Sequence, residues 1–441
     1  MSRLYRFISL LPRPSQQLSL RLPTSRAFSG IIPKVAGINK SKQVVEDYDK
    51  YVAQNYTPLK DVVIARGEGV YVYDIEGRRY YDFLTGYSAM NQGHRHPKIL
   101  AALKEQADRL TLTGRCYYND MLGKYAKYAT ELLGYDRLLP MNGGVEASES
   151  SIKMSRRWGY EVKGVPDNEA KVILCRGNFW GRSIAAASSS TDPSCFMGYG
   201  PFVPGFELIP FNDIPALEHA LKDQHVVAFM VEPIQGEAGI IVPDKGYLSK
   251  ARELCTKNNV LLICDEIQCG LGRSGKMLAS EYESVRPDIL VLGKALSGGF
   301  MPISAVLADD QYMSMMKSGT HGSTFGGNPL ASALAIASLR AIVEGGMCEN
   351  AYKMGEIFRK EAATFRRDII RDVRGMGLFN AIELNPNCGV SASTVNEKLR
   401  DHGILSKSTH EYTFRMAPAL TINEEQLMDA LSLMKKALEE C

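Results

Sequence analysis

The chain has 441 residues, of which 45% are hydrophobic and 23% are charged, a composition typical of a multidomain globular protein and not of a disordered chain. The formal charge is +3, but the first 45 residues carry eight Lys or Arg and no acid, which leaves 44 basic against 49 acidic residues, or −5, for residues 46–441. A basic tail on an acidic body argues against nucleic-acid binding. No apolar run approaches the roughly 18 to 20 residues that span a bilayer. We therefore expect chemistry on a small molecule, with neither nucleic acid nor membrane as partner.

The N-terminal segment has the composition of a targeting sequence. Residues 1–33 combine five arginines with Ser and Leu and contain no acid, which is typical of an organelle transit peptide rather than a secretory signal. The stretch from Arg26 to Ser29 resembles a mitochondrial processing site, and we expect cleavage after Phe28. The predicted location is the mitochondrial matrix. The alternative is a cytoplasmic location, with an N-terminal tail that is not a targeting signal.

The cysteines and histidines predict neither disulfides nor a metal site. Nine cysteines, an odd number without CxxC spacing in a chain too large to need disulfides, indicate free thiols in a reducing compartment. His94 and His96 share one segment, but no HExxH or other ligand pair has metal spacing.

The first regular element predicted after the leader is a β-hairpin. Residues 70–83 read VYVYD, IEGR and RYYDF, which places a turn near Gly77 between two strands. We assign this hairpin to an N-terminal segment, residues 34–94.

The middle of the chain predicts an α/β domain. Short apolar runs alternate with helix-length segments between residues 171 and 309, a pattern typical of a doubly wound sheet whose strands are buried on both faces. The five runs are KVILC, VVAFMVEP, VLLICDE, DILVLGK and ISAVLAD. We assign residues 95–345 to this large domain and residues 346–441, which contain FNAIEL and FRMAPAL among helical stretches, to a smaller α+β domain.

Two strand ends carry residues that suit Schiff-base chemistry. Ligands of open α/β sheets lie at the carboxyl ends of the strands. Lys294 follows the run DILVL, where burial would lower its pKa and free the amine to attack an aldehyde. Asp265 ends the run VLLICD, and a carboxylate there can pair with a protonated pyridine nitrogen. The alternatives are a solvated lysine and an aspartate that caps a turn.

A third feature suits a phosphate. Asn142, Gly143, Gly144 and Val145 lead into a helix-like run, so that glycine-rich backbone would present free N–H groups at a helix N-terminus. Phe179, in GNFWGR after the KVILC run, could stack on a flat ring. An ordinary loop before a helix is the alternative.

Together these segments resemble subgroup III of the fold type I aminotransferases, which depend on pyridoxal 5'-phosphate. The resemblance covers nearly the whole chain after the leader and implies a large doubly wound mixed-sheet domain, a smaller α+β C-terminal domain, and a homodimer with an active site shared across the interface. Seven motifs carry it, in chain order: NQGHRHP at 91–97, NGGVEA at 142–147, GNFWGR at 177–182, VEPIQGEAG at 231–239, DEIQCGLGRSG at 265–275, LGKALSGG at 292–299 and HGSTFGGNP at 321–329.

The resemblance assigns roles around the cofactor. It implies that Lys294 carries the cofactor as a Schiff base and shuttles the proton, that Asp265 holds the pyridine nitrogen, that Gln268 contacts the ring hydroxyl and that Phe179 stacks on the ring. Position 143 is Gly where the resemblance leads us to expect a hydroxyl. The remaining cofactor-binding residues that it implies are Gly143, Gly144, Val145, Ile267 and, from a second subunit, Ser323 and Thr324.

Within that family, the combination of Tyr56 in QNYTPLK, Tyr87 in GYSAMNQGH and the GNFWGR segment is similar to that of the ornithine aminotransferases. The resemblance implies transfer of the δ-amino group of L-ornithine to 2-oxoglutarate, with Arg182 on the α-carboxylate, Tyr56 on the α-amino group and Tyr87 shaping the pocket. Arg415 would bind the second carboxylate of 2-oxoglutarate. Glu237 would neutralise Arg415 while the diamine is bound and swing aside for the diacid. Bidentate pairing with carboxylates is the reason for arginine at both positions.

Three alternatives stay open from the sequence. A sister aminotransferase would use N-acetylornithine or 4-aminobutyrate, and a 4-aminobutyrate enzyme is expected to carry an aliphatic residue in place of Tyr87. A mutase on the same fold would have no diacid for Arg415 to hold. A catalytically silent dimer would not need the Lys294, Asp265 and Arg182 set.

Overall fold

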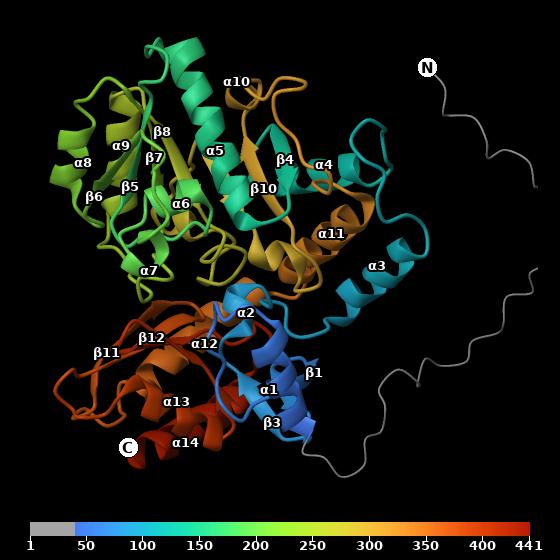
Figure 1. Cartoon of the computed structure of the whole chain (residues 1–441), viewed down its shortest axis with the longest axis vertical. Coiled ribbons are helices and arrows are strands. Elements are labelled where there is room, and N and C mark those ends of the chain that lie inside the picture. The colour runs from blue at the N-terminus through green and yellow to red at the C-terminus, as the bar shows by residue number, and fades with distance from the viewer. Residues whose placement is uncertain (1–39) are drawn as a thin grey trace, which may run out of the picture. The chain divides into compact units, whose positions relative to one another are not determined.

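The structure is a computed structural model that describes residues 40–441, so the predicted transit peptide lies outside the described residues (Figure 1). It divides into two compact units at Asp61. The described part of the first unit contains helix α1 (Lys40–Tyr51). Among the described residues, no single helix is long and apolar enough to cross a bilayer; the bent pair α11 (Pro329–Glu344) and α12 (Met347–Ala362) passes that test by length and composition alone.

The second unit is built on a seven-stranded mixed sheet in the order β4-β10-β9-β8-β7-β5-β6. β10 is antiparallel to both of its neighbours, and the other pairs are parallel. The five predicted runs form β5, β7, β8, β9 and β10, so the predicted fold class is confirmed, whereas β4 and β6 were not predicted. The strands are β4 Arg137–Met141, β5 Lys171–Cys175, β6 Phe206–Ile209, β7 Val226–Val231, β8 Leu261–Asp265, β9 Ile289–Leu292 and β10 Ser304–Ala308.

Helices cover both faces of this sheet because successive strand side chains point to opposite sides. In β5, Val172 and Leu174 pack in one cluster with helix α5 (Gly144–Trp158). Ile173 and Cys175 pack in another cluster with α8 (Ile214–Ala220) and α9 (Tyr247–Lys257). The continuous apolar runs of the sequence are therefore the expected result of burial on two sides.

The predicted hairpin is present. β2 (Tyr71–Asp74) pairs antiparallel with β3 (Arg79–Asp82), and Gly77 in the turn has a φ of +94°, which glycine adopts at little cost. β1 (Ile64–Glu68) extends this sheet on one side, and β13 (Ile404–Leu405), from the far end of the chain, adds to β3 on the other.

The C-terminal part forms the predicted α+β unit. Its four-stranded antiparallel sheet has the order β11-β12-β15-β14, in which FNAIEL is β12 and FRM ends β15. The elements are β11 Ile370–Met376, β12 Phe379–Leu384, β14 Lys407–Thr409, β15 Thr413–Met416, α13 Ala392–Asp401 and α14 Glu424–Glu439. The remaining helical elements are α2 Thr85–Ser88, α3 Pro97–Ala107, α4 Leu122–Leu133, η1 Gly159–Lys163, α6 Ile184–Ser188, α7 Pro193–Phe196, η2 Ala279–Glu283, η3 Lys294–Ser297 and α10 Asp310–Met313.

Candidate active site

Two neighbouring strands bring the predicted lysine and aspartate to one edge of the sheet. β8 and β9 are parallel, with Asp265 opposite Val291. Lys294 follows three residues after Val291, at the start of η3, and its φ of +42° lies in the left-handed region. For a residue other than glycine this conformation is strained and is held by the surrounding structure. The predicted adjacency of Asp265 and Lys294 at the carboxyl edge agrees with this arrangement.

Burial perturbs both groups. Burial lowers the pKa of Lys294, against the opposing effect of Glu237 and Asp265. Asp265 is 4% exposed, and burial raises its pKa to about 6 even though the Ile267 amide donates to its Oδ1 at 3.0 Å. No cation is hydrogen-bonded to Asp265 among the described residues; its other partner is the Ser148 hydroxyl at 3.5 Å. A cationic ring nitrogen would supply the missing partner.

At the N-terminus of α5, two backbone amides are free to bind an anion. The Oε2 atom of Glu146 accepts from the Gly143 amide at 2.6 Å and from the Asn142 amide at 2.9 Å, so those two N–H groups are engaged. The next two amides, of Gly144 and Val145, have no acceptor within residues 40–441. A Cβ built on Gly144 would lie 3.0 Å from Cδ1 of Ile267, so a larger residue there would require Ile267 to shift. A helix N-terminus with free amides is a phosphate-binding arrangement.

Glu232 is a residue of this region that the sequence analysis did not single out. Its Oε1 accepts from the Phe179 amide at 3.1 Å, and its Oε2 accepts from the Gly236 amide at 3.0 Å. Burial, followed by the nearby charge of Asp265, raises the pKa of Glu232 to about 8. Glu232 directly follows β7, as Asp265 ends β8, so the same strand-end rule would have found it.

Four predicted substrate and cofactor residues come together beside this edge. Arg415 of β15 is 4% exposed and donates through Nη1 to Oε1 of Glu237. Its guanidinium carbon lies 4.8 Å from the centre of the Tyr87 ring. Nε2 of Gln268 lies 3.4 Å from Oε1 of Glu237 and 3.5 Å from the Tyr87 carbonyl oxygen.

Glu237 is ionised in this arrangement. Burial raises its pKa, but the charges of Arg415 and Lys294 and the hydrogen bond from Arg415 outweigh burial and leave the pKa below its ordinary value. The result is a carboxylate paired with a buried guanidinium. Such a pair can exchange the protein carboxylate for a substrate carboxylate at the same arginine.

Tyr87 is presented by a turn of left-handed helix. The four consecutive residues Thr85–Ser88 have φ values from 48° to 73°. For residues other than glycine this conformation costs roughly 1–2 kcal/mol each. Oδ1 of Asp82 accepts from the amides of Leu84 and Thr85 at 2.9 and 2.8 Å, which holds the start of the turn. Backbone strain is therefore concentrated next to a predicted substrate residue.

The structure shows fewer contacts for the other predicted site residues. The guanidinium carbon of Arg182, which is exposed, lies 5.4 Å from the centre of the Phe179 ring. Ser323 accepts through Oγ from Asn142 Nδ2 at 2.8 Å, while Thr324 is exposed. Tyr56 belongs to the first unit. The roles predicted for all these residues stay predictions.

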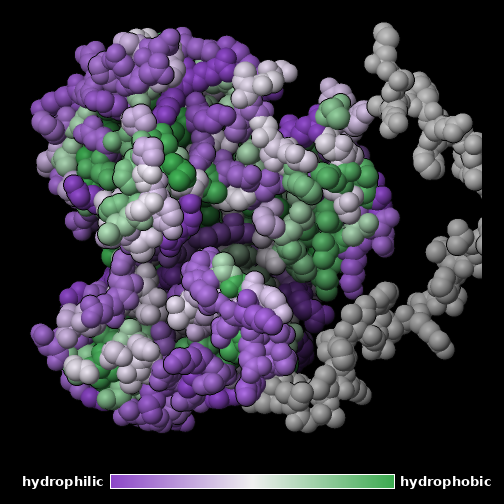
Figure 2. Space-filling view, viewed as in Figure 1, coloured by the Kyte–Doolittle hydropathy of each residue, from purple (hydrophilic) through white to green (hydrophobic). Residues whose placement is uncertain are grey.

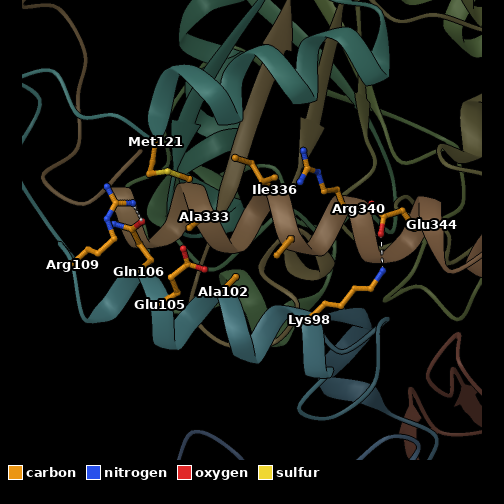
Figure 3. Close-up of a pocket in the computed structure, with 11 residues that line it drawn as sticks. Lys98, Ala102, Glu105, Gln106, Arg109, Met121, Ala333, Ile336, Arg340 and Glu344 are labelled. Carbon is orange, nitrogen blue, oxygen red and sulfur yellow. Dashed lines mark hydrogen bonds and ion pairs between the residues drawn. The ribbon is translucent and has the colours of Figure 1, made fainter.

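A separate cavity of about 400 Å³ lies between α3 and α11 (Figure 3). The ion pair between Lys98 and Glu344 lies at one end, and Arg109 and Gln106 lie at the other. None of the predicted site residues lines this cavity.

The mixed sheet, with Lys294 at its carboxyl edge, is the fold of the fold type I aminotransferases. The class-III aminotransferase family model matches residues 51–438, and the chain belongs to this family. It is thus an aminotransferase that acts on amino acid and 2-oxo acid substrates.

Three relatives support this assignment. The chain is 53% identical over 402 residues to the mitochondrial ornithine aminotransferase of Rattus norvegicus, with 91% of each sequence covered. It is similar to the ornithine aminotransferase of Toxoplasma gondii in a structure that reports partial occupancy of pyridoxal phosphate, with a TM-score of 0.88, 48% identity, and 90% and 94% coverage. It is also similar to the acetylornithine aminotransferase of Elizabethkingia anophelis, with a TM-score of 0.83, 48% identity, and 91% and 99% coverage.

Proposed function

We propose that this protein transfers the δ-amino group of L-ornithine to 2-oxoglutarate. The products are L-glutamate and glutamate 5-semialdehyde, which cyclises to pyrroline-5-carboxylate. The observation that carries the proposal is the ion pair between buried Arg415 and partly buried Glu237, which lies beside Tyr87 and near enough to Lys294 for the charges to interact. The names of the rat and T. gondii relatives support the same substrate.

The Arg415–Glu237 pair suits two substrates of different charge. Ornithine has one carboxylate and two amines, whereas 2-oxoglutarate has two carboxylates. A guanidinium left unpaired in a buried site is costly, so Glu237 neutralises Arg415 while ornithine occupies the pocket. When 2-oxoglutarate enters, its second carboxylate takes the place of the Glu237 carboxylate on Arg415.

The opposite end of the substrate requires its own anchors. We assign the α-carboxylate of ornithine to Arg182 and its α-amino group to Tyr56, with Tyr87 closing the pocket. An anchor on the α-carbon leaves the δ-amine as the one that reaches Lys294. The contact of Arg182 with the Phe179 ring supports its place near the cofactor side of the pocket.

The residues present fit pyridoxal 5'-phosphate. The Gly144 and Val145 amides would bind its phosphate, with Ser323 and Thr324 of a second subunit completing the cup. The amide of Gly143 is already engaged by Glu146, so its part is to shape the loop. Phe179 would cover one face of the ring, Ile267 and Gln268 would contact it, and the cofactor would supply an aldehyde for the amino group and a ring that withdraws electrons.

Lys294 and Asp265 carry the proton and charge chemistry of this proposal. Burial lowers the pKa of Lys294, so its Nζ has an available lone pair. Lys294 would act as the general base that takes the proton from the amine-bearing carbon of the substrate, and then as the general acid that gives this proton back. Asp265 remains ionised when a cationic ring nitrogen lies beside it, and this pairing keeps the ring electron-poor.

The assembly we propose is a homodimer with a shared site. Figure 2 shows hydrophobic surface over α3, α4 and α11. Large apolar or aromatic side chains are exposed nearby in the sequence at Leu110, Tyr117, Tyr118 and Phe325. Phe325 adjoins Ser323 and Thr324, so a second copy that covers this surface would also lie next to those hydroxyls.

We also propose a mitochondrial matrix location and the domain limits drawn from the sequence. The mitochondrial name of the rat relative and the arginine-rich composition of residues 1–33 support the location. The limits are residues 1–33, 34–94, 95–345 and 346–441, and the separate sheets of the large and small domains support the division near residue 345.

The visible absorption spectrum of the purified protein tests the function. Ornithine should remove the band of the bound cofactor, and 2-oxoglutarate should restore it. A Lys294→Ala variant should show neither response, while Lys98→Ala, a surface control, should behave as the wild type. If the cofactor band does not change when ornithine is added, ornithine is not the substrate. If the protein binds no cofactor, the proposed aminotransferase activity is wrong.

N-acetylornithine is a second candidate substrate, because the E. anophelis acetylornithine aminotransferase is also 48% identical. The two candidates differ at the α-amino group, which is acetylated in one and charged in the other. We expect kcat/KM for ornithine to exceed that for N-acetylornithine by at least about tenfold, since acetylation removes the charge of the α-amine and a hydrogen bond to a charged group contributes about 1.5–3 kcal/mol. A higher kcat/KM for N-acetylornithine than for ornithine would make N-acetylornithine the substrate.

A further inference from the structure

A fully buried arginine that has no role in the proposed reaction is hydrogen-bonded to several segments around the substrate pocket. Arg273 follows β8 in the DEIQCGLGRSG motif and has no exposed surface. Both Nε and Nη2 donate to Oδ1 of Asn91, at 3.1 and 2.6 Å, and Nη2 also donates to Oγ1 of Thr85 at 3.3 Å. Nη1 donates to the carbonyl oxygens of Leu378 and Pro418, at 2.9 and 2.6 Å.

None of these acceptors is a carboxylate. The negative charge of Asp82 acts on Arg273 without a hydrogen bond between them, and Asp82 is itself paired with His94 and caps the left-handed turn. Burial lowers the pKa of Arg273 to about 9. A buried cation without an ion pair is costly, and apolar residues of similar volume can often replace buried charges at no loss of stability. Filling space is therefore a poor explanation for arginine at this position.

The acceptors belong to segments that are far apart in the sequence and that carry the substrate residues. Thr85 begins the left-handed turn that presents Tyr87. Pro418 lies three residues after Arg415 and two residues past the end of β15. The Thr85 hydroxyl also donates to the Ala417 carbonyl oxygen at 2.7 Å, which ties the turn directly to the β15 segment.

We propose that Arg273 is a positioning residue that holds Tyr87 against Arg415 and thereby fixes the substrate pocket. The inference uses the proposed function for its substrates. Its geometry explains the residue type, because guanidinium has five N–H donors in a rigid planar fork, whereas the ammonium of lysine donates from one atom. It also explains a β-branched Thr85 at a φ of 48°, because its hydroxyl accepts from Arg273 and donates to Ala417.

The matched pair Thr85→Val and Thr85→Ser tests this link in the holoenzyme. Valine keeps the shape but loses both hydrogen bonds, whereas serine keeps the hydroxyl. We expect Thr85→Val to raise KM for both ornithine and 2-oxoglutarate by about tenfold, the size expected for two lost buried hydrogen bonds. kcat should stay within about threefold, because Lys294 and Asp265 lie on other segments. Thr85→Ser should match the wild type.

Arg273→Lys provides a second variant, and it should raise both KM values at least as much while the visible cofactor band is retained. The inference is overturned if Thr85→Val lowers only the melting temperature, or lowers kcat with KM unchanged. It is also overturned if Thr85→Ser loses as much as Thr85→Val. Should the wild-type protein prefer another amino acid to ornithine, the proposed function fails separately, and the same KM comparison is made with the substrate that is turned over.

Discussion

The cofactor side and the substrate side of the site are built in different ways. Asp265 and Lys294 lie at the ends of two adjacent parallel strands, within 30 residues of each other in the chain. Tyr87 and Arg415 lie more than 300 residues apart, one on a strained left-handed turn and the other on a small antiparallel sheet. Regular strand geometry places the first pair, whereas hydrogen bonds between distant segments place the second.

This difference separates chemistry from specificity. In the proposed function the residues on the cofactor side serve both half-reactions, so we expect substitutions there to affect ornithine and 2-oxoglutarate alike. On the substrate side, Arg415 and Glu237 are proposed to meet the charges of one substrate at a time, so substitutions of these two residues should affect the two substrates unequally. Loss of a positioning contact such as that of Thr85 should instead raise KM for both substrates. The predictions below test this separation in order of expected size.

The largest effect is expected for Asp265→Asn, which keeps the shape and removes the charge. The amide cannot stabilise a cationic ring nitrogen, and losing one preorganised electrostatic contact typically lowers kcat by roughly 10²–10³-fold. Both half-reactions, measured separately in a stopped-flow spectrometer, should slow by similar factors. Slowing of only one half-reaction would contradict the separation.

The same substitution should stabilise the protein without cofactor. Because the folded-state pKa of Asp265 is raised from 3.8 to about 6, its contribution favours folding at low pH and is lost as the pH rises through about 6. Asp265→Asn should therefore exceed the wild-type apoprotein in stability by roughly 3 kcal/mol at pH 7 and by less at pH 5. Urea unfolding at both pH values measures the difference. An equal gap at pH 5 and pH 7 would show that the charge of Asp265 is not its source.

Arg415→Gln should affect one substrate only. Removal of the guanidinium takes away the partner for the second carboxylate of 2-oxoglutarate, and a charged hydrogen bond contributes about 1.5–3 kcal/mol. KM for 2-oxoglutarate should rise by roughly 10- to 100-fold, while the ornithine half-reaction changes little. Steady-state kinetics with each substrate varied in turn would detect this, and an equal change for both substrates would argue against the role given to Arg415.

The smallest effect is expected for Glu237→Gln. The uncharged side chain leaves Arg415 without its neutralising partner, so KM for 2-oxoglutarate should fall and KM for ornithine should rise, each by about fivefold. The same kinetic assay measures both directions. A change of the same sign for both substrates would contradict an exchange of carboxylates on Arg415.

The sequence predicted the strands that end beside Lys294 and Asp265 for a physical reason. A run of buried apolar residues predicts a strand, and the rule that ligands lie at carboxyl strand ends points to the residues that follow. That rule identified Lys294 and Asp265, whose adjacency the structure confirms. Applied to β7 it would also have found Glu232. β4 and β6 were missed; most β4 and β6 residues are only partly buried, and RLLPM contains a proline.

The chain by itself therefore determined the elements with strong hydrophobic periodicity, the family motifs and the residues that end each strand, because these depend on local pattern. Only the tertiary structure decided the left-handed turn at Tyr87 and the buried hydrogen bonds of Arg273. Left-handed backbone in residues other than glycine, and a buried cation without an ion pair, run against local preference. They exist only because segments far apart in the chain hold them in place.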